Sequence, residues 1–269
     1  MRSTSASGVT IRYDDRGGDE PALLLMPDWC ADHSVYAGLT SRLAEKNRVL
    51  ALDWRGHGES QHPEDDFDCH DLVQDALAVI EASGSQGIVP VAQAHAGWVA
   101  VELRRRLGER VPKLILLDWI VGNPPPDFLE LLKTMQTNQW RDGRDRLFEV
   151  WRAGARNEEL ERYLDEVVST FDRAMWARAA RAIEEAYLEC GNPLVELSRL
   201  DPPSPVLHLY SQPNDPAFDD MQTVFALKHP WYRFQRLDAQ THFGMFELPD
   251  QMAALIAEFA GTEARGKAA

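Results

Sequence analysis

The segment that decides the fold is residues 88–98, which read Ile88-Val89-Pro90-Val91-Ala92-Gln93-Ala94-His95-Ala96-Gly97-Trp98. An apolar run, a turn of small residues and a following apolar-periodic segment predict a buried strand, a sharp turn and a helix. This is the layout of a nucleophile elbow, where small neighbours permit the strained turn that lifts the central side chain above the sheet. Ala92, Ala96 and Gly97 meet that steric demand. An ordinary strand-to-helix turn of a doubly wound sheet is the alternative interpretation.

The centre of this elbow is Ala94 rather than a nucleophile. A methyl group has no oxygen to attack a carbonyl and no proton for a base to remove. We therefore expect that covalent acyl transfer is unavailable and that the protein is not a serine hydrolase.

An acid and a histidine follow the elbow. Asp118 directly follows the apolar run 114–117, and His242 lies in a short loop after the last predicted strand. The chain order of elbow, acid and histidine is that of the triad in the α/β-hydrolase fold, so we predict this fold with His242 and Asp118 as the catalytic pair. Asp215 is the competing acid, because it follows the strand that often supplies that residue. We prefer Asp118, since Asp215 lies in a polar stretch typical of an ordinary turn.

The rest of the chain fits a mostly parallel sheet flanked by helices, because short apolar runs alternate with longer periodic ones. The predicted strands are 10–13, 22–26, 49–53, 88–91, 114–117, 206–210 and 232–237, and the predicted helices include 71–83, 98–107 and 249–259. Residues 123–200 are amphipathic and contain no strand candidate. We therefore expect an α/β-hydrolase core made of residues 1–122 and 201–269, with an inserted helical cap over residues 123–200. Residues 261–269 are small and polar and are predicted to fray.

Several further side chains are candidates for the site. Trp29 follows the first core strand, where this fold supplies one oxyanion-hole amide, and His95 follows the elbow centre, where the second amide lies. Trp29 alternatively only packs, and the His95 ring points either at substrate or into the fold. His33 either reaches the pocket or caps the next helix. The turn Asp53-Trp54-Arg55-Gly56-His57-Gly58 is interpreted as structural, with glycine-dependent geometry.

The predicted cap contains Trp140, Trp151 and Trp176, out of eight tryptophans in the chain. Most of them should pack in the core. A cap nevertheless lines the cavity that it covers, and flat aromatic walls suit a flat aromatic ligand better than a flexible acyl chain. We therefore include Trp151 and Trp176 among the expected substrate contacts.

Composition excludes several classes of function. The chain has 269 residues with 28 Lys plus Arg against 43 Asp plus Glu, a net charge of −15, so we expect no nucleic acid or anionic membrane as partner. No signal peptide or membrane span is indicated, and three distant cysteines suit a reducing cytoplasm. No phosphate-loop, dinucleotide or metal-ligand motif is present, so we expect neither an organic cofactor nor a metal. The sequence does not decide whether the chain forms a homo-oligomer.

With these residues in place, the sequence resembles the cofactor-independent ring-cleaving dioxygenases that act on 3-hydroxy-4(1H)-quinolones. The resemblance covers nearly the whole chain. Its most specific parts are residues 29–33 (WCADH), 53–58 (DWRGHG), 90–98 (PVAQAHAGW), 117–119 (LDW), 210–213 (YSQP) and 241–243 (THF).

The resemblance implies that His242, supported by Asp118, removes the proton of the substrate 3-hydroxyl. The electron-rich anion then reacts with O₂ without a metal or flavin, and the ring opens with loss of carbon monoxide to leave an N-acylanthranilate. Such a reaction requires a base of near-neutral pKa, an acid that orients it and a dry apolar pocket.

The sequence departs from the family pattern at three positions. Ala94 replaces a serine, Gln93 a histidine and Ala31 a further histidine. The smaller residues leave space, which favours the branch that cleaves 2-alkyl-3-hydroxy-4-quinolones, including the Pseudomonas quinolone signal. Two other functions stay open: a catalytically dead fold used as a small-molecule receptor, and hydrolysis in which His242 activates water without a covalent intermediate.

Overall fold

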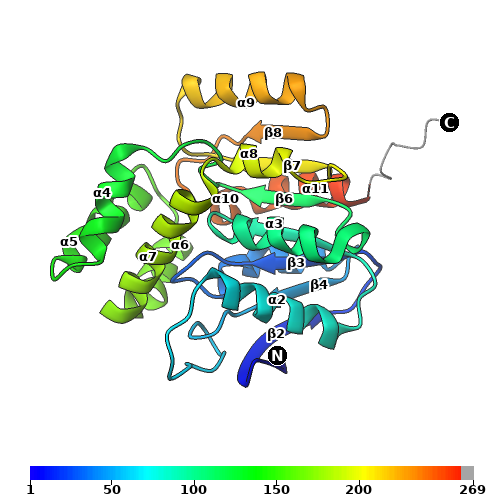
Figure 1. The fold of residues 1–269 in the computed structure, drawn as a ribbon, viewed down its shortest axis with the longest axis horizontal. Helices are drawn as coiled ribbons and strands as arrows, with labels where there is room; N and C mark the ends of the chain where they lie inside the picture. Colours follow the sequence, from blue (N-terminus) through cyan, green and yellow to red (C-terminus); the bar gives the residue numbers. More distant parts are fainter. Residues whose placement is uncertain (262–269) are drawn as a thin grey trace.

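An eight-stranded sheet forms the centre of the computed structural model, which describes residues 1–261 (Figure 1). The strand order is β1-β2-β4-β3-β5-β6-β7-β8. The pairs β1–β2 and β2–β4 are antiparallel, and the remaining neighbours are parallel. The strands are β1 Arg2–Ala6, β2 Val9–Arg16, β3 Ala22–Met26, β4 Val49–Leu52, β5 Ile88–Gln93, β6 Leu114–Leu117, β7 Val206–Tyr210 and β8 Tyr232–Arg236.

Helices cover both faces of this sheet. Helices α2 and α3 pack together on one face, in front of the sheet in Figure 1, and α1 packs against α11 on the other. The core strands β3 to β7 are buried along their whole length, which explains why they read as continuous apolar runs. The helices outside the β6–β7 connection are α1 Ala37–Leu43, α2 Cys69–Ser83, α3 Ala96–Leu107, α9 Pro216–Lys228, α10 Gly244–Glu247 and α11 Pro249–Gly261, with short 3₁₀ turns η1 His33–Tyr36 and η2 Gly108–Arg110.

The connection between β6 and β7 is entirely helical. Figure 1 shows α4 to α7 beyond the ends toward which the strand arrows point, and α8 over the sheet. Helices α4, α5 and α7 pack against one another, and α6 packs against η3. The elements are α4 Pro126–Met135, α5 Trp140–Arg152, α6 Glu158–Glu166, η3 Val168–Thr170, α7 Arg173–Cys190 and α8 Pro193–Ser198. Helices α4 to α7 therefore cover the carboxyl edge of the sheet, where α/β folds place their ligands.

Two elements were not predicted from the sequence pattern. Strand β1 is a polar edge strand that pairs only with β2, so its residues lack the apolar alternation of a half-buried strand. Helix α9 completely buries only Gln222, which leaves it without a clear apolar stripe. Asp215, interpreted as part of an ordinary turn, is the N-cap of this helix and accepts a hydrogen bond from the Ala217 amide at 2.9 Å. The predicted fraying of residues 261–269 falls, beyond Gly261, outside the described residues.

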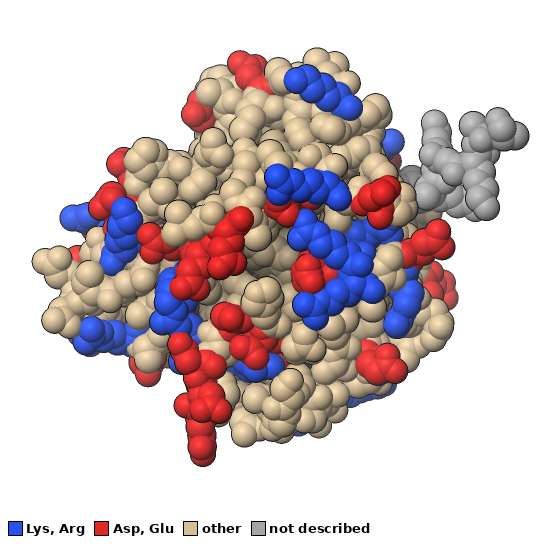
Figure 2. Space-filling view, in the orientation of Figure 1, with Lys and Arg blue, Asp and Glu red and all other residues tan. Residues whose placement is uncertain are grey.

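Basic side chains gather over α3 on the face shown in Figure 2, among many acidic ones. Arg105 forms an ion pair with Glu196, and Arg106 with Glu102 at 2.7 Å. This local neutralisation leaves little free positive charge for an anionic partner. Within residues 1–261, no helix is both long enough and apolar enough to cross a membrane.

Candidate active site

The elbow has the strained geometry that its sequence predicts. Ala94, between β5 and α3, has a φ of 44°, in the left-handed region, and is buried. Its amide donates to the Leu117 carbonyl at 2.7 Å, and its own carbonyl accepts from the Gly97 amide at 3.0 Å. A Cβ at Gly97 would lie 2.4 Å from the Trp119 ring, so glycine is required there. The protein keeps a backbone conformation that costs about 1–3 kcal/mol although the nucleophile is absent.

Asp118 is buried after the end of β6, and one of its two carboxylate oxygens accepts hydrogen bonds. Its Oδ1 accepts from the Ser211 amide at 2.7 Å, the Ser211 hydroxyl at 2.9 Å and the Gln212 amide at 3.2 Å. Its Oδ2 is buried without a hydrogen-bond partner among the described residues. Burial raises the pKa of Asp118, and the nearby His242 opposes that shift. The free oxygen therefore lies in a setting where an imidazolium would stabilise it.

The loop that carries His242 is held from both sides. The Glu247 carboxylate accepts from the amides of Gln240 and Thr241 at 2.8 and 2.9 Å and from the Thr241 hydroxyl at 2.5 Å. The Ser211 hydroxyl lies 2.6 Å from the Thr241 carbonyl. Ser211 thus links the acid to the histidine loop. The His242 ring stacks parallel to Trp151 of α5, with ring centroids 6.3 Å apart.

A small cavity of about 10 Å³ lies between this loop, the elbow and the cap, just enough for one water molecule. A bicyclic ligand can enter it only if side chains or the cap shift, because ligand sites are usually some hundreds of Å³. The residues around the cavity come from the loop after β3, the end of β5, the cap and the His242 loop: Asp28, Trp29, Cys30, Ala31, Gln93, Trp151, Val168, His242 and Phe243.

Three of the predicted substrate contacts, Trp29, Gln93 and Trp151, therefore line one cavity together with the predicted base His242. The Gln93 side chain is almost fully buried, and its Oε1 has no hydrogen-bond partner among residues 1–261. An acceptor buried in this way favours a ligand that donates a hydrogen bond.

Three other predicted contacts are turned elsewhere. Trp176 packs against Phe148 within the cap and is not among the residues around the cavity. The His95 ring is stacked on Phe128, with 5.8 Å between centroids. His33 binds Asp53 through its Nδ1, at 2.9 Å, and its backbone amide donates to the same carboxylate at 2.7 Å. That hydrogen bond raises the pKa of His33.

His57 holds the loop after β3 in place. Its Nδ1 lies 2.9 Å from the Arg55 carbonyl, and its Nε2 lies 3.1 Å from the Cys30 amide. A neutral ring with the proton on Nδ1 satisfies both contacts. Cys30 has a φ of 56°, so this bond supports a strained residue at the cavity wall. His57 is therefore structural, as the sequence predicts for this turn.

We expect the contributions of His57 and His208 to the free energy of unfolding to fall as the pH drops from about 6.5 to about 4. Burial lowers the pKa of His57 and of His208 to about 4 each. Between that value and about 6.5, the unfolded chain binds protons that the folded chain excludes, so stability is lost with falling pH, by roughly 3 kcal/mol per histidine.

Denaturant unfolding at about pH 7 and about pH 5 measures this loss. His57→Asn and His208→Asn should each reduce the difference between the two pH values, and His70→Asn, at an exposed position, should not. An equal difference in all four proteins would contradict the assignment.

Several residues around the site were not singled out from the sequence. Asp28, Val168 and Phe243 line the cavity, and Ser211 and Glu247 fix the acid and the histidine loop. Asp28 neighbours the predicted Trp29 in the chain, and Phe243 and Ser211 lie within segments 241–243 and 210–213 that carry the resemblance. Val168 and Glu247 carry no local signal, since only tertiary packing brings them to the site.

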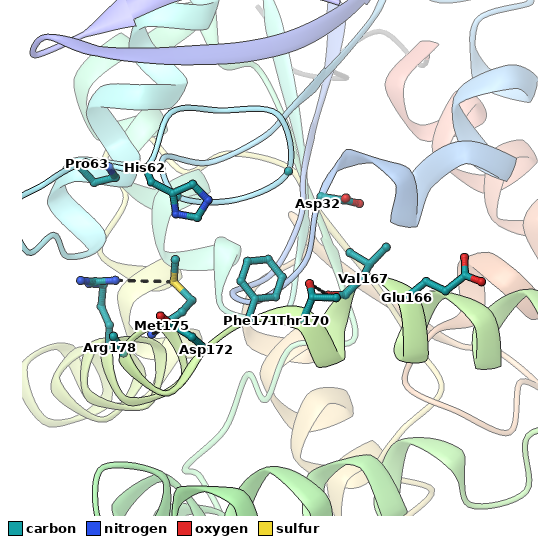
Figure 3. Close-up of a pocket in the computed structure, with 13 residues that line it drawn as sticks. Asp32, His62, Pro63, Glu166, Val167, Thr170, Phe171, Asp172, Met175 and Arg178 are labelled. Carbon is teal, nitrogen blue, oxygen red and sulfur yellow. Dashed lines mark hydrogen bonds between the residues drawn. The ribbon is translucent and has the colours of Figure 1, made fainter.

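A second, larger cavity of about 530 Å³ lies where the junction of α6 and α7 meets core loops (Figure 3). Asp32 and Val167 line it, each next in sequence to a residue that lines the His242 cavity, and Phe171 lines it as well. Its wall is mixed, with His62, Asp172 and Arg178 also present. Among residues 1–261, no group of three His, Cys, Asp or Glu side chains is arranged to hold a metal ion.

Fold and site together define an α/β-hydrolase-fold protein with Ala94 at the elbow centre, Asp118 after β6 and His242 in the loop after β8. The model of the alpha/beta hydrolase family matches residues 23–255. The predicted fold class is therefore confirmed.

Comparison with known proteins narrows this class. A 2-heptyl-3-hydroxy-4-quinolone dioxygenase of Rhodococcus erythropolis is 36% identical over 258 residues, 94% of this chain and 96% of that protein. The 1H-3-hydroxy-4-oxoquinoline 2,4-dioxygenase of Pseudomonas putida is 33% identical over 261 residues, 96% of this chain and 99% of that one. AqdC recognises and cleaves the ring of the Pseudomonas quinolone signal, and the structure of an AqdC variant has been solved with its substrate. This chain matches that structure with a TM-score of 0.92 and 33% identity, over 96% of this chain and 98% of that one. The chain belongs to the family of 3-hydroxy-4-quinolone 2,4-dioxygenases, as the resemblance in its motifs predicts.

Proposed function

We propose that this protein cleaves the heterocyclic ring of 2-alkyl-3-hydroxy-4(1H)-quinolones with O₂. The products are carbon monoxide and an N-acylanthranilate, so both oxygen atoms of O₂ and all atoms of the quinolone are accounted for. The relatives named for 2-heptyl-3-hydroxy-4-quinolone support this substrate class. We also propose that the enzyme acts in the cytoplasm, where its three free cysteines would remain reduced.

In the proposed mechanism, His242 is the general base that takes the proton of the 3-hydroxyl. Asp118 orients the ring and stabilises the imidazolium through its free Oδ2. The quinolone anion adds O₂ at C2, and the peroxide attacks C4 to close an endoperoxide. The O–O, C2–C3 and C3–C4 bonds then break, so that C3 leaves with its own oxygen as carbon monoxide and one oxygen atom of O₂ stays on C2 and the other on C4. Trp29, Gln93 and Trp151 hold the ring, with residues 123–200 acting as the cap over a core of residues 1–122 and 201–269. His33, His95 and Trp176 act indirectly, by packing and positioning.

The observation that carries this proposal is the retained pair of His242 and Asp118 over an elbow without a nucleophile. A receptor has no need of a buried carboxylate near a histidine, since burial of that charge is unfavourable. A serine hydrolase needs the missing hydroxyl. Base-assisted oxygenation needs the pair and not the hydroxyl, because the substrate carbanion reacts with O₂.

Purified protein in air-saturated, chelator-treated buffer tests the proposal. We expect loss of quinolone absorbance, with equimolar O₂ uptake and carbon monoxide release, for a series of 2-alkyl-3-hydroxy-4-quinolones. Binding without turnover across the series would instead support a receptor. Hydrolysis of activated esters that depends on His242 would support water activation.

We expect Ala94→Ser to change the rate of ring cleavage at most a few-fold. The methyl-to-hydroxymethyl change fits the elbow and adds a group for which the proposed reaction has no use. The same variant should show no efficient turnover of 4-nitrophenyl esters. Efficient esterase activity in Ala94→Ser would mean that the site is a hydrolase lacking one atom, and would count against the proposed reaction.

A further inference from the structure

The amide that should form half of an oxyanion hole is already occupied. The backbone N–H of His95 donates to Oδ1 of Asp28 at 3.3 Å, and the Nδ1 of the same histidine lies 3.4 Å from that oxygen. In this fold the amide after the elbow centre binds the oxyanion of an acyl-transfer intermediate. A carboxylate of the protein therefore lies where a hydrolase would place the negative oxygen of its substrate.

Asp28 also reaches the cavity. It lines the same small space as Gln93 and His242, and its side chain is 15% exposed. Among the described residues, His95 is its one ion-pair partner, and no Lys or Arg neutralises it. The negative charge acts on its neighbours, since it contributes to the raised pKa values of Cys30 and Tyr187.

A carboxylate at this position selects the chemistry of the ligand. It only accepts hydrogen bonds, so it repels a carbonyl oxygen on which negative charge develops and favours an N–H or O–H donor. A 3-hydroxy-4(1H)-quinolone carries two donors, the 3-hydroxyl and the ring N–H. The hydroxyl is assigned to His242 in the proposed function, which leaves the ring N–H.

We propose that Asp28 is a specificity-determining residue that accepts a hydrogen bond from the ring N–H of the quinolone. This inference rests on the proposed function and adds to it the recognition of the heteroatom at ring position 1. A charge-assisted bond is roughly twice as strong as a neutral one, which favours Asp28 over the neutral Oε1 of Gln93 as the acceptor. Accepting this hydrogen bond also increases the electron density of the ring, which promotes its reaction with O₂.

The test uses two ligands that differ only at ring position 1: a 2-alkyl-3-hydroxy-4(1H)-quinolone and the matching 2-alkyl-3-hydroxychromen-4-one, in which oxygen replaces N–H. Anaerobic fluorescence titration gives Kd for each, and aerobic assays give kcat/KM. We expect the wild type to prefer the quinolone by about 10–100-fold in Kd, because the chromenone leaves the carboxylate facing ring oxygen lone pairs. Asp28→Asn can turn its NH₂ toward that oxygen, so the preference should fall to within a few-fold.

The control variant is Gln93→Met, which removes the competing acceptor. It should keep the preference for the quinolone, whatever its effect on overall affinity. An unchanged preference in Asp28→Asn, or its loss in Gln93→Met alone, would overturn the assignment. If Asp28→Asn fails to fold by circular dichroism, Asp28→Ser replaces it under the same criteria.

The titration separates this inference from the proposed function. Wild type that binds both ligands but cleaves neither would contradict the proposed function, and the Kd ratios would still decide the role of Asp28. Cleavage of the quinolone together with unchanged ratios in Asp28→Asn would overturn only the role of Asp28.

Ester hydrolysis gives a second, independent measurement. If Asp28 occupies the oxyanion position, Asp28→Gly combined with Ala94→Ser should hydrolyse 4-nitrophenyl acetate at least about 10-fold faster than Ala94→Ser alone, because the His95 amide is then free. Equal rates in the two variants would contradict this occupancy.

Discussion

Replacing His242 with alanine is expected to abolish ring cleavage and to leave ligand binding within about 10-fold of the wild type. A positioned general base contributes about 10²–10⁴-fold, and the described cavity contains no other unpaired histidine nitrogen to replace it. Binding should persist, since Trp29, Gln93 and Trp151, which line the cavity and are proposed to hold the ring, are unchanged.

Anaerobic difference spectra report whether the bound quinolone has lost its 3-hydroxyl proton. The wild type should bind the quinolone with the absorption of its 3-oxide anion, and His242→Ala with that of the neutral form. His70→Ala, at an exposed histidine, is the matched control and should behave as wild type. Carbon monoxide release by His242→Ala at more than about one tenth of the wild-type rate would contradict the role of His242 as the base.

Replacing Asp118 with asparagine is expected to lower kcat by about 10²–10⁴-fold with a much smaller change in KM. The asparagine Oδ1 can still accept from Ser211 and Gln212, so the fold around it is maintained. The negative charge that stabilises the imidazolium of His242 is lost, and the amide NH₂ now faces the ring.

Because Asp118 acts through His242, its test needs a readout that a merely structural role would not change. The fraction of bound quinolone present as the anion should fall in Asp118→Asn, although Kd and the thermal unfolding temperature stay near the wild-type values. Asp215→Asn is the matched control, since Asp215 is the competing acid from the sequence and caps the exposed start of α9. Loss of activity in Asp215→Asn with full activity in Asp118→Asn would mean that Asp215, and not Asp118, is the acid that supports His242.

Much of this site could be predicted because its parts stand at the ends of strands that are easily recognised. Strands buried on both faces read as short apolar runs, and a residue that follows such a run is placed at the sheet edge by chain connectivity alone. The elbow at Ala94, the acid Asp118 and the histidine loop were found in this way. Among the described residues, three of the four non-glycine positions with positive φ are Cys30, Ala94 and Asp118, so backbone strain gathers where the sequence predicts the site.

Side-chain direction could not be predicted in the same way. Trp151 and Trp176 looked equivalent in the cap sequence, yet Trp151 stacks on His242 and Trp176 packs against Phe148. The difference follows from how α5 and α7 pack against one another and the core. His33 was likewise ambiguous until the fold brought Asp53 within hydrogen-bond distance of its ring.

The sequence alone determined the fold class and the absent nucleophile and predicted the pair of His242 and Asp118, because these depend on the order of residues along the chain and on local apolar patterns. Only the tertiary structure decided that the Asp28 carboxylate accepts a hydrogen bond from the His95 amide and that Ser211 links the acid to the histidine loop. The physical reason is that hydrogen bonds between distant segments form only after sheet packing and loop closure have fixed their distances. No local pattern in either partner encodes such a bond.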